Sequence, residues 1–325
     1  MANLKFKVAI MGKGRIANAL GFYLNKNNIS VCEDISRSDL IIGALGGDFG
    51  EDCLKAALHY KKNLLDISDV DPPFYLKHKS QIERSGITVI PGCGFSPGLV
   101  NLIIGRELAI NPGIRKIEIK AGSLSGKNNY FPFLWCFEDL ILGHKLFSWQ
   151  LVRGKKKRFA PLAGLQKENF FGIQAESYLS ASGIENLFTG RGLTDFQYRV
   201  IRPLGFINFL KFLINQGFLD KANFALTKKI LEEKKEDNFS FANVSLSGPG
   251  KKIEWLLKSS SKKNEQLNSM QKITSAAPVI IANFLKENKI GKGLLFMEQL
   301  GSDEVLFSDL INRAREEGIV LQRKP

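Results

Sequence analysis

The chain has 325 residues, of which 44% are hydrophobic and 24% charged, and this composition excludes disordered and low-complexity proteins. The length suits two domains better than one. The formal net charge of +14 would suit a nucleic-acid-binding protein, but the basic residues are spread along the sequence. Only residues 155–158 form a compact basic cluster, which we interpret as a solvated turn between two strands.

The sequence carries no pattern typical of secretion or of a membrane span. Its first residues are mixed in character, and no stretch reaches the roughly 18 apolar residues that a spanning helix needs. Residues 204–219 are rich in apolar side chains but interrupted by polar ones, so we predict a buried helix there. The cysteines follow no C-x-x-C spacing, which argues against a zinc site and a disulfide framework. We therefore expect a cytoplasmic protein with no bound metal and no membrane contact.

A glycine turn lies near the start of the sequence. An apolar strand pattern ends at Met11, the pattern G-x-G-x-x-A follows, and apolar residues then recur at helical spacing. Gly12 permits a tight turn, and Gly14 lets a phosphate approach the backbone. The N-terminus of the helix would offer N–H groups and a partial positive charge to a pyrophosphate. We predict that four residues of this turn bind a nicotinamide dinucleotide: Gly12, Gly14, Arg15 and Ile16.

Two acidic residues follow the second predicted strand, at residues 29–32. An acidic side chain at this distance from the glycines typically holds the ribose hydroxyls, and Glu33 and Asp34 occupy the position. Their negative charge would repel a 2′-phosphate, so it favours NAD over NADP. The alternative is that both are solvated loop residues.

The third apolar run, residues 38–45, begins too soon after the second strand. A helical crossover between parallel strands needs about a dozen residues, and about six are present. An extended loop of that length reaches roughly 20 Å, barely enough to return to the other edge of a strand. We therefore predict a truncated, doubly wound Rossmann sheet with a shallow adenosine pocket, in which Leu45 and Gly46 contact the cofactor. The remaining elements of this domain are predicted as a helix at 51–59, a strand at 63–67, a helix at 73–85 and a strand at 88–90.

The middle of the chain favours an α+β domain. We predict three units: a nucleotide-binding domain at 1–112, a substrate and dimerisation domain at 113–270, and a helical segment at 271–325 that returns to the first domain. Strand patterns of the second domain occupy 114–122, 147–151, 239–246 and 252–257, and a long helix is predicted at 268–286. We expect three aromatic residues near the basic cluster to be strand core: Phe147, Trp149 and Phe159.

Several segments together resemble the saccharopine dehydrogenase superfamily, which includes saccharopine reductase, carboxynorspermidine dehydrogenase and lysine 6-dehydrogenase. The matching segments are NLLDISD at 63–69, GCGFSPGLVN at 92–101, WCFEDL at 135–140, VIRPLGF at 200–206, and IGKG with MEQLG at 290–301. They run in family order along nearly the whole chain. The chain departs from the pattern at Ser96, where the family has an aspartate, and in the missing βα unit.

The resemblance implies a Rossmann domain with an inserted α/β substrate domain, a homodimer, and hydride transfer between a secondary amine and an imine. Such a site needs a group that handles the nitrogen proton, and we select Asp69, with Cys93 as a residue that touches the substrate nitrogen. The structural alternatives are a helix cap for Asp69 and a small buried thiol for Cys93.

Other side chains would hold the substrate and the cofactor. Arg199 and Arg202 are candidates for substrate carboxylates, with surface ion pairing as the alternative. Glu138 would contact a substrate ammonium or face solvent. Ser96 and Asn101 would face the nicotinamide, although the Ser96 hydroxyl would instead cap a helix that has Pro97 at its first position.

The leading hypothesis is an NAD- or NADP-dependent oxidoreductase that acts on an amino-acid-derived amine, a small-molecule substrate. The alternative is a weak or inactive relative that binds a ligand or partner without turnover, which the short nucleotide domain and Ser96 motivate. A nucleic-acid-binding module is a third hypothesis, which we do not favour because it rests on the net charge alone.

Overall fold

The computed structural model describes residues 6–46, 49–68, 70–125, 137–143, 145–181, 187, 192–232 and 236–324. The chain forms two compact units. Unit 1 comprises 1–114, 182–191 and 271–319, and unit 2 comprises 115–181, 192–270 and 320–325. The chain therefore leaves unit 1, builds unit 2, and returns for the last helices of unit 1.

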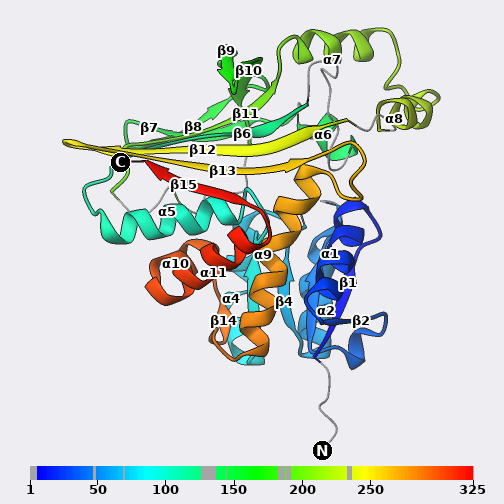
Figure 1. Cartoon of the computed structure of the whole chain (residues 1–325), viewed down its shortest axis with the longest axis vertical. Helices are drawn as coiled ribbons and strands as arrows, with labels where there is room; N and C mark the ends of the chain where they lie inside the picture. The colour runs from blue at the N-terminus through cyan, green and yellow to red at the C-terminus, as the bar shows by residue number, and fades with distance from the viewer. Residues whose placement is uncertain are drawn as a thin grey trace, which may run out of the picture. The chain divides into compact units, whose positions relative to one another are not determined.

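Unit 1 is built on a parallel sheet of six strands in the order β14-β5-β4-β3-β1-β2 (Figure 1). Its strands are β1 (Lys7–Met11), β2 (Ser30–Cys32), β3 (Leu40–Gly43), β4 (Asn63–Asp66), β5 (Thr88–Pro91) and β14 (Gly293–Leu294). Its helices are α1 (Arg15–Lys26), η1 (Ile35–Arg37, a 3₁₀ turn), α2 (Glu51–Tyr60), α3 (Pro72–Lys77), α4 (Lys79–Ser85), α5 (Leu99–Ile110), α9 (Ser269–Lys286), α10 (Met297–Ser302) and α11 (Glu304–Glu316). The two first residues of α9 belong to unit 2.

The predicted truncated Rossmann sheet is confirmed, and the link between β2 and β3 shows how it is shortened. Strand β3 pairs with β1 on the side opposite to β2, and the connection contains only the turn η1. The usual second helix and third strand are missing, so β2 is the edge of the sheet. The order β2-β1-β3 retains the point at which the strand order reverses, where open α/β sheets bind ligands.

Helices α2, α3 and α4 cover one face of this sheet with an apolar cluster. Its buried members include Ile41, Leu54 and Leu64, together with Tyr75 and Val89. The continuous burial of the central strand β3 explains why its sequence is apolar throughout rather than alternating. This packing fixes the carboxyl ends of β3, β4 and β5 side by side.

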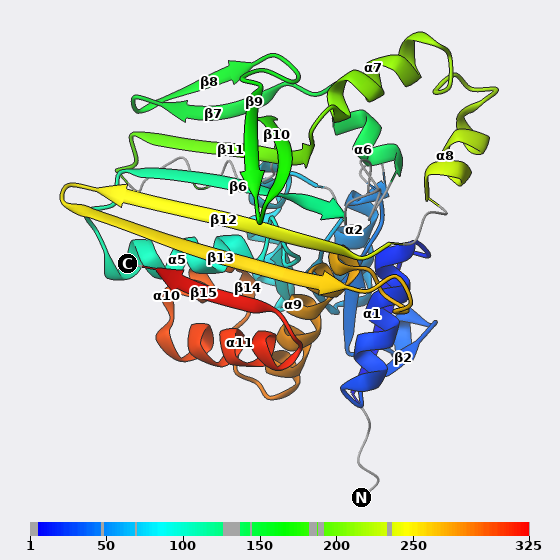
Figure 2. The same cartoon turned by 45° about the horizontal axis from the view of Figure 1, so that its top comes forward.

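Unit 2 contains a mixed sheet of nine strands, with β15-β13-β12-β6-β11-β10-β9 in order; β7 also pairs with β11, and β8 pairs with β7 (Figure 2). Its strands are β6 (Lys116–Ser125), β7 (Ser148–Val152), β8 (Lys155–Phe159), β9 (Gln166–Phe170), β10 (Ile173–Leu179), β11 (Asp195–Pro203), β12 (Asn238–Gly248), β13 (Lys251–Ser261) and β15 (Val320–Lys324). Its helices are α6 (Phe137–Gly143), α7 (Phe206–Asn215) and α8 (Phe224–Glu232). An apolar cluster of α6 and α7 packs on Tyr178 and Val200 of the sheet.

Three sequence interpretations in this part of the chain are wrong. The basic cluster is strand β8, which pairs with β7, because the turn lies one step earlier at Arg153 and Gly154, both with positive φ. Phe147 and Trp149 are not core; they are 48% and 40% exposed, and Arg158 and Lys156 lie over their rings. Residues 320–324 form β15, paired with β13 of the second sheet, rather than a helical end.

Among the described residues, no helix is both long and apolar enough to cross a membrane. Within the same ranges, no group of histidine, cysteine, aspartate and glutamate side chains is arranged to hold a metal ion. Cys32, Cys53 and Cys93 are free thiols.

Candidate functional site

The glycine turn has the backbone geometry that the sequence predicts. Gly12 has φ of +146°, and a Cβ at this position would collide with the carbonyl group of Ala44. Only glycine fits there, because it must adopt this φ while β1 passes close to the end of β3. Gly14 is the N-cap of α1, and a Cβ built on it would meet nothing within 4 Å. Gly12 is thus required by the fold, whereas at Gly14 the structure leaves open space beside the helix N-terminus.

The N-terminus of α1 suits an anion. No side chain caps the helix, its first turn contains no acidic residue, and Lys13 and Gly14 are exposed. The first N–H groups of a helix lack backbone partners, and they carry the positive end of the helix dipole. The helix N-terminus is therefore open to an anion at Gly14, and Arg15 and Ile16 belong to its first turn.

The two acidic residues after β2 have different environments. Asp34 is the N-cap of η1, and its Oδ1 accepts hydrogen bonds from the Ser36 N–H at 2.9 Å and from the Ser36 hydroxyl at 2.6 Å. These bonds lower the pKa of Asp34. Glu33 is exposed. Asp34 therefore serves the short link between β2 and β3, and Glu33 is the acidic side chain that remains for a ribose.

A buried polar network lies at the carboxyl ends of β3 and β4. Asp66 Oδ1 accepts the Ser68 N–H at 2.8 Å, and its Oδ2 accepts the Tyr75 hydroxyl at 2.7 Å. The Ser68 hydroxyl in turn accepts the N–H of Leu45 at 3.1 Å. One carboxyl group thus holds the loop after β4, and Ser68 connects that loop by a hydrogen bond to the loop after β3. The loop after β3 contains Leu45 and Gly46, which were predicted to contact the cofactor.

Asp66 is completely buried, and burial raises its pKa, against the opposing effect of the hydrogen bonds from Tyr75 and Ser68. A Cβ on Gly43 would lie 2.6 Å from Asp66 Oδ1, so the carboxyl group needs a glycine beside it. Asp66 lies within the NLLDISD motif, but no role was predicted for it. The signal that was available is the D-x-S spacing at the end of a buried strand, which allows a carboxylate to accept the N–H two residues ahead.

Cys93 follows β5 and is fully buried. Its N–H and its thiol both point to the carbonyl oxygen of Asp66, with N···O at 3.3 Å and S···O at 3.7 Å. Burial and the nearby charge of Asp66 raise the pKa of the thiol above its usual range. The group is therefore a neutral thiol at pH 7, and its surroundings favour packing over proton transfer. Its contact with a substrate stays a prediction.

The loop after β5 is tightly folded, and its helix begins later than the sequence suggests. Helix α5 starts at Leu99 with Gly98 as N-cap, and Asn101 Oδ1 accepts the Gly98 N–H at 3.0 Å. The predicted cap by Ser96 is therefore wrong, because Asn101 satisfies the helix start instead. The Ser96 hydroxyl oxygen is buried, and it has no hydrogen-bond partner among the described residues. The contacts of Ser96 and Asn101 with a cofactor stay predictions.

The predicted acid/base, Asp69, lies outside the described residues. Helix α3 starts shortly after it with Asp71 as N-cap. Glu138 lies on α6 and forms an ion pair with Lys228 of α8 at 2.7 Å. This pair gives Glu138 a partner within unit 2.

The two candidate arginines lie on opposite faces of β11. Side chains alternate along a strand, and the odd separation of Arg199 and Arg202 sends them to different sides. Arg199 is buried; its Nε donates to the Ser177 hydroxyl at 3.0 Å, and its Nη2 donates to the carbonyl oxygen of Gly164. These contacts hold the neighbouring strand β10 and the loop before β9.

Arg202 lies at the carboxyl end of β11, on the face of Val200. Its Nη1 donates to the carbonyl oxygen of Ile201 at 3.0 Å, and its guanidinium lies 5.6 Å from the ring centre of Phe206. Because the two arginines face different sides, they do not act together on one carboxylate, and both are buried.

Comparisons with solved structures identify the fold. Saccharopine dehydrogenase (L-Glu forming) from Saccharomyces cerevisiae is 14% identical, covers 98% of this chain and 99% of its own, and gives a TM-score of 0.75. DAP dehydrogenase from C. glutamicum in complex with DAP is 11% identical over 95% of this chain and 99% of its own, with a TM-score of 0.45. An engineered D-amino acid dehydrogenase bound to NADP⁺ is 12% identical over 95% and 99%, with a TM-score of 0.46.

The chain matches no protein-family model and no curated protein sequence. The likeness to saccharopine dehydrogenase shows that the chain has that fold over almost its entire length. The other two likenesses are more remote.

Proposed function

We propose that this chain is a nicotinamide-dependent oxidoreductase that transfers a hydride at a carbon–nitrogen bond of an amino-acid-derived substrate. The observation that carries the proposal is the open space at Gly14, directly at the uncapped N-terminus of α1. A glycine is not needed there for backbone strain, since its φ is −81°. The shared fold with saccharopine dehydrogenase and the five matching segments support the choice of reaction.

In this proposal the cofactor and three side chains have separate tasks. The bound nicotinamide would give or accept the hydride at carbon. Asp69 would take the proton from the substrate nitrogen during amine oxidation and return it during imine reduction. Arg202 would hold a substrate carboxylate, because a guanidinium donates two parallel hydrogen bonds to it. Asp66 would not touch the substrate; its hydrogen bonds hold Ser68 and Tyr75.

We further propose that NAD is preferred over NADP. Glu33 is exposed at the end of β2, where its carboxylate would bind ribose hydroxyls and repel a 2′-phosphate. The variant Glu33→Gln removes the charge and keeps the size. We expect it to narrow the ratio of the Kd values for NADPH and NADH by about tenfold, which corresponds to about 1.4 kcal/mol. An unchanged ratio would assign the selectivity to another residue.

The cofactor site is tested by a pair of variants on one helix. A valine at Gly14 meets no atom of the protein near its Cβ but fills the space proposed for the pyrophosphate. Gly21 lies in the same helix, and a Cβ there also meets nothing within 4 Å, so Gly21→Val is the matched control. In a fluorescence titration with NADH, we expect the wild type and Gly21→Val to bind and Gly14→Val to lose at least tenfold in affinity.

Equal NADH affinities in all three proteins would contradict the proposed cofactor site. Turnover is then tested by following NADH absorbance with secondary amines that join two amino-acid skeletons, saccharopine among them. Binding of NADH without any turnover of this class would favour the alternative hypothesis of a ligand-binding relative.

A further inference from the structure

Helix α9 touches both ends of the proposed dinucleotide site from within unit 1. Gln271, in its first turn, donates a hydrogen bond from Nε2 to the carbonyl oxygen of Arg15 at 2.9 Å. Arg15 is the first residue of α1, immediately after Gly14. The two partners are 256 positions apart in the sequence, so the bond fastens the glycine turn to a distant element.

The next turn of the same helix reaches the loop after β5. A Cβ built on Gly94 would lie 3.3 Å from Thr274 Cγ2, so Gly94 packs closely against this methyl group. Gly94 is also joined to Gly98 by a backbone bridge, and this bridge closes the loop that carries Ser96. Residues at i and i+3 lie on one side of a helix, so Gln271 and Thr274 present a common face.

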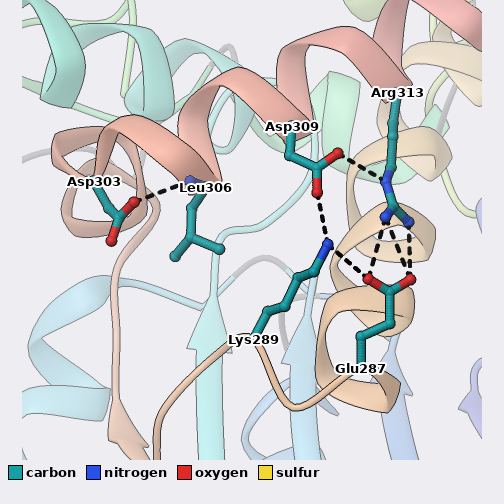
Figure 3. A network of polar contacts seen from close by, with 6 residues as sticks. All are labelled: Glu287, Lys289, Asp303, Leu306, Asp309 and Arg313. Carbon is teal, nitrogen blue, oxygen red and sulfur yellow. Dashed lines mark hydrogen bonds and ion pairs between the residues drawn. The ribbon is translucent and has the colours of Figure 1, made fainter.

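The other end of α9 lies in a network of partly exposed ion pairs. Glu287 directly follows the helix and pairs with Arg313 of α11 at 3.2 Å, while Lys289 pairs with Glu287 at 2.8 Å and with Asp309 at 2.9 Å (Figure 3). Asp309 also pairs with Arg313 at 3.2 Å, which closes the network. Asp303 caps α11 through its bond to the Leu306 N–H at 3.0 Å.

We propose that the start of α9 positions the cofactor site, with Gln271 holding the pyrophosphate turn and Thr274 holding the loop at the nicotinamide end. This proposal rests on the proposed function, which supplies the direction of the dinucleotide. Neither residue touches the reacting atoms, so both are positioning residues. The two contacts act on different halves of the dinucleotide. Their effects can therefore be distinguished by comparing the whole dinucleotide with a ligand that lacks the nicotinamide.

The experiment compares NADH with ADP-ribose, which contains the pyrophosphate but no nicotinamide. Gln271→Met keeps the length of the side chain and removes the donor. We expect it to raise the Kd of both ligands about fivefold, since one hydrogen bond is lost. Thr274→Ser removes the methyl group that packs on Gly94 and keeps the hydroxyl. We expect it to raise the Kd of NADH about threefold and to leave that of ADP-ribose unchanged.

Gln81→Met is the matched control, because Gln81 is a glutamine on helix α4 of unit 1 whose side chain contacts His78. It is expected to change neither Kd. If Gln271→Met leaves both Kd values at the wild-type level, or if both variants weaken the two ligands equally, the positioning proposal is wrong while the proposed function stands. If the wild type itself binds neither ligand, the proposed function fails and the positioning proposal with it.

Discussion

Each unit buries an ionisable side chain within a strand, Asp66 in β4 and Arg199 in β11. The two units compensate for the cost of burying a charge in different ways. Asp66 of unit 1 receives hydrogen bonds from a hydroxyl and a backbone N–H, and no cation is among the groups that shift its pKa. Arg199 of unit 2 donates to Ser177 and Gly164, with the charges of Glu118 and Glu168 nearby. Burial shifts both pKa values toward the neutral form. An arginine nevertheless stays charged, whereas a carboxyl group can escape the cost by taking up a proton.

The largest expected effect comes from removing the buried cation. Arg199→Met keeps the apolar stem but leaves the carbonyl oxygen of Gly164 and the Ser177 hydroxyl without their donor. We expect unit 2 to lose about 3 kcal/mol of unfolding free energy. All three tryptophans belong to the sequence of unit 2, so urea unfolding followed by tryptophan fluorescence reports on this unit. A loss below about 1 kcal/mol would show that Arg199 contributes only packing.

Two variants of Asp66 test how much its hydrogen bonds stabilise unit 1. Asp66→Ala leaves the Ser68 N–H and the Tyr75 hydroxyl unsatisfied in the interior, and we expect a loss of about 2 kcal/mol. Asp66→Asn keeps an acceptor for Ser68 and offers its N–H to Tyr75, so the expected loss is below about 1 kcal/mol at pH 7. Hydrogen exchange of the β4 amides measures the stability loss of each variant in unit 1. Equal losses in the two variants would mean that the charge itself is required.

The raised pKa of Asp66 also predicts how the stability of the protein changes with pH. Burial raises the pKa of Asp66 in the folded protein, so the protonated form is favoured by folding. Its contribution is fully present below the unfolded pKa of about 3.9 and is lost as pH rises through the folded value. The variant Asp66→Asn has no titratable group at this position, so it does not lose this stability as pH rises. The melting temperature of the variant relative to the wild type should therefore be higher at pH 8 than at pH 4, and the opposite order would exclude a raised pKa.

The smallest effect is expected for the ion pairs at the end of α9, which are partly exposed. Arg313→Ala removes the contacts to Glu287 and Asp309, and we expect a loss of about 0.5 kcal/mol that shrinks in 1 M salt. The comparison with Arg199→Met then measures how much burial adds to the value of a charged contact. A loss as large as that of Arg199→Met would show that this network is shielded from solvent.

The sequence alone predicted the parts of the fold that depend on short stretches of chain. The glycine turn followed from Gly12 and Gly14, and the missing βα unit followed from the short distance between two apolar runs. The opposite faces of Arg199 and Arg202 were not predicted, because no strand was expected at residues 195–203, and only within a strand does the parity of their separation fix the side. The strand at residues 155–158 was missed, since a run of four basic residues has no apolar periodicity from which to predict pairing.

Only the tertiary structure decided which groups meet. Asp66 accepts its hydrogen bond from Tyr75 because α3 packs on β4, and Gln271 reaches Arg15 because the chain returns to unit 1 after building unit 2. Local patterns encode backbone geometry, since glycine and apolar spacing act over a few residues. The partners and burial of a polar side chain depend on segments far away in the sequence, and these determine the pKa of Asp66 and the surroundings of Cys93.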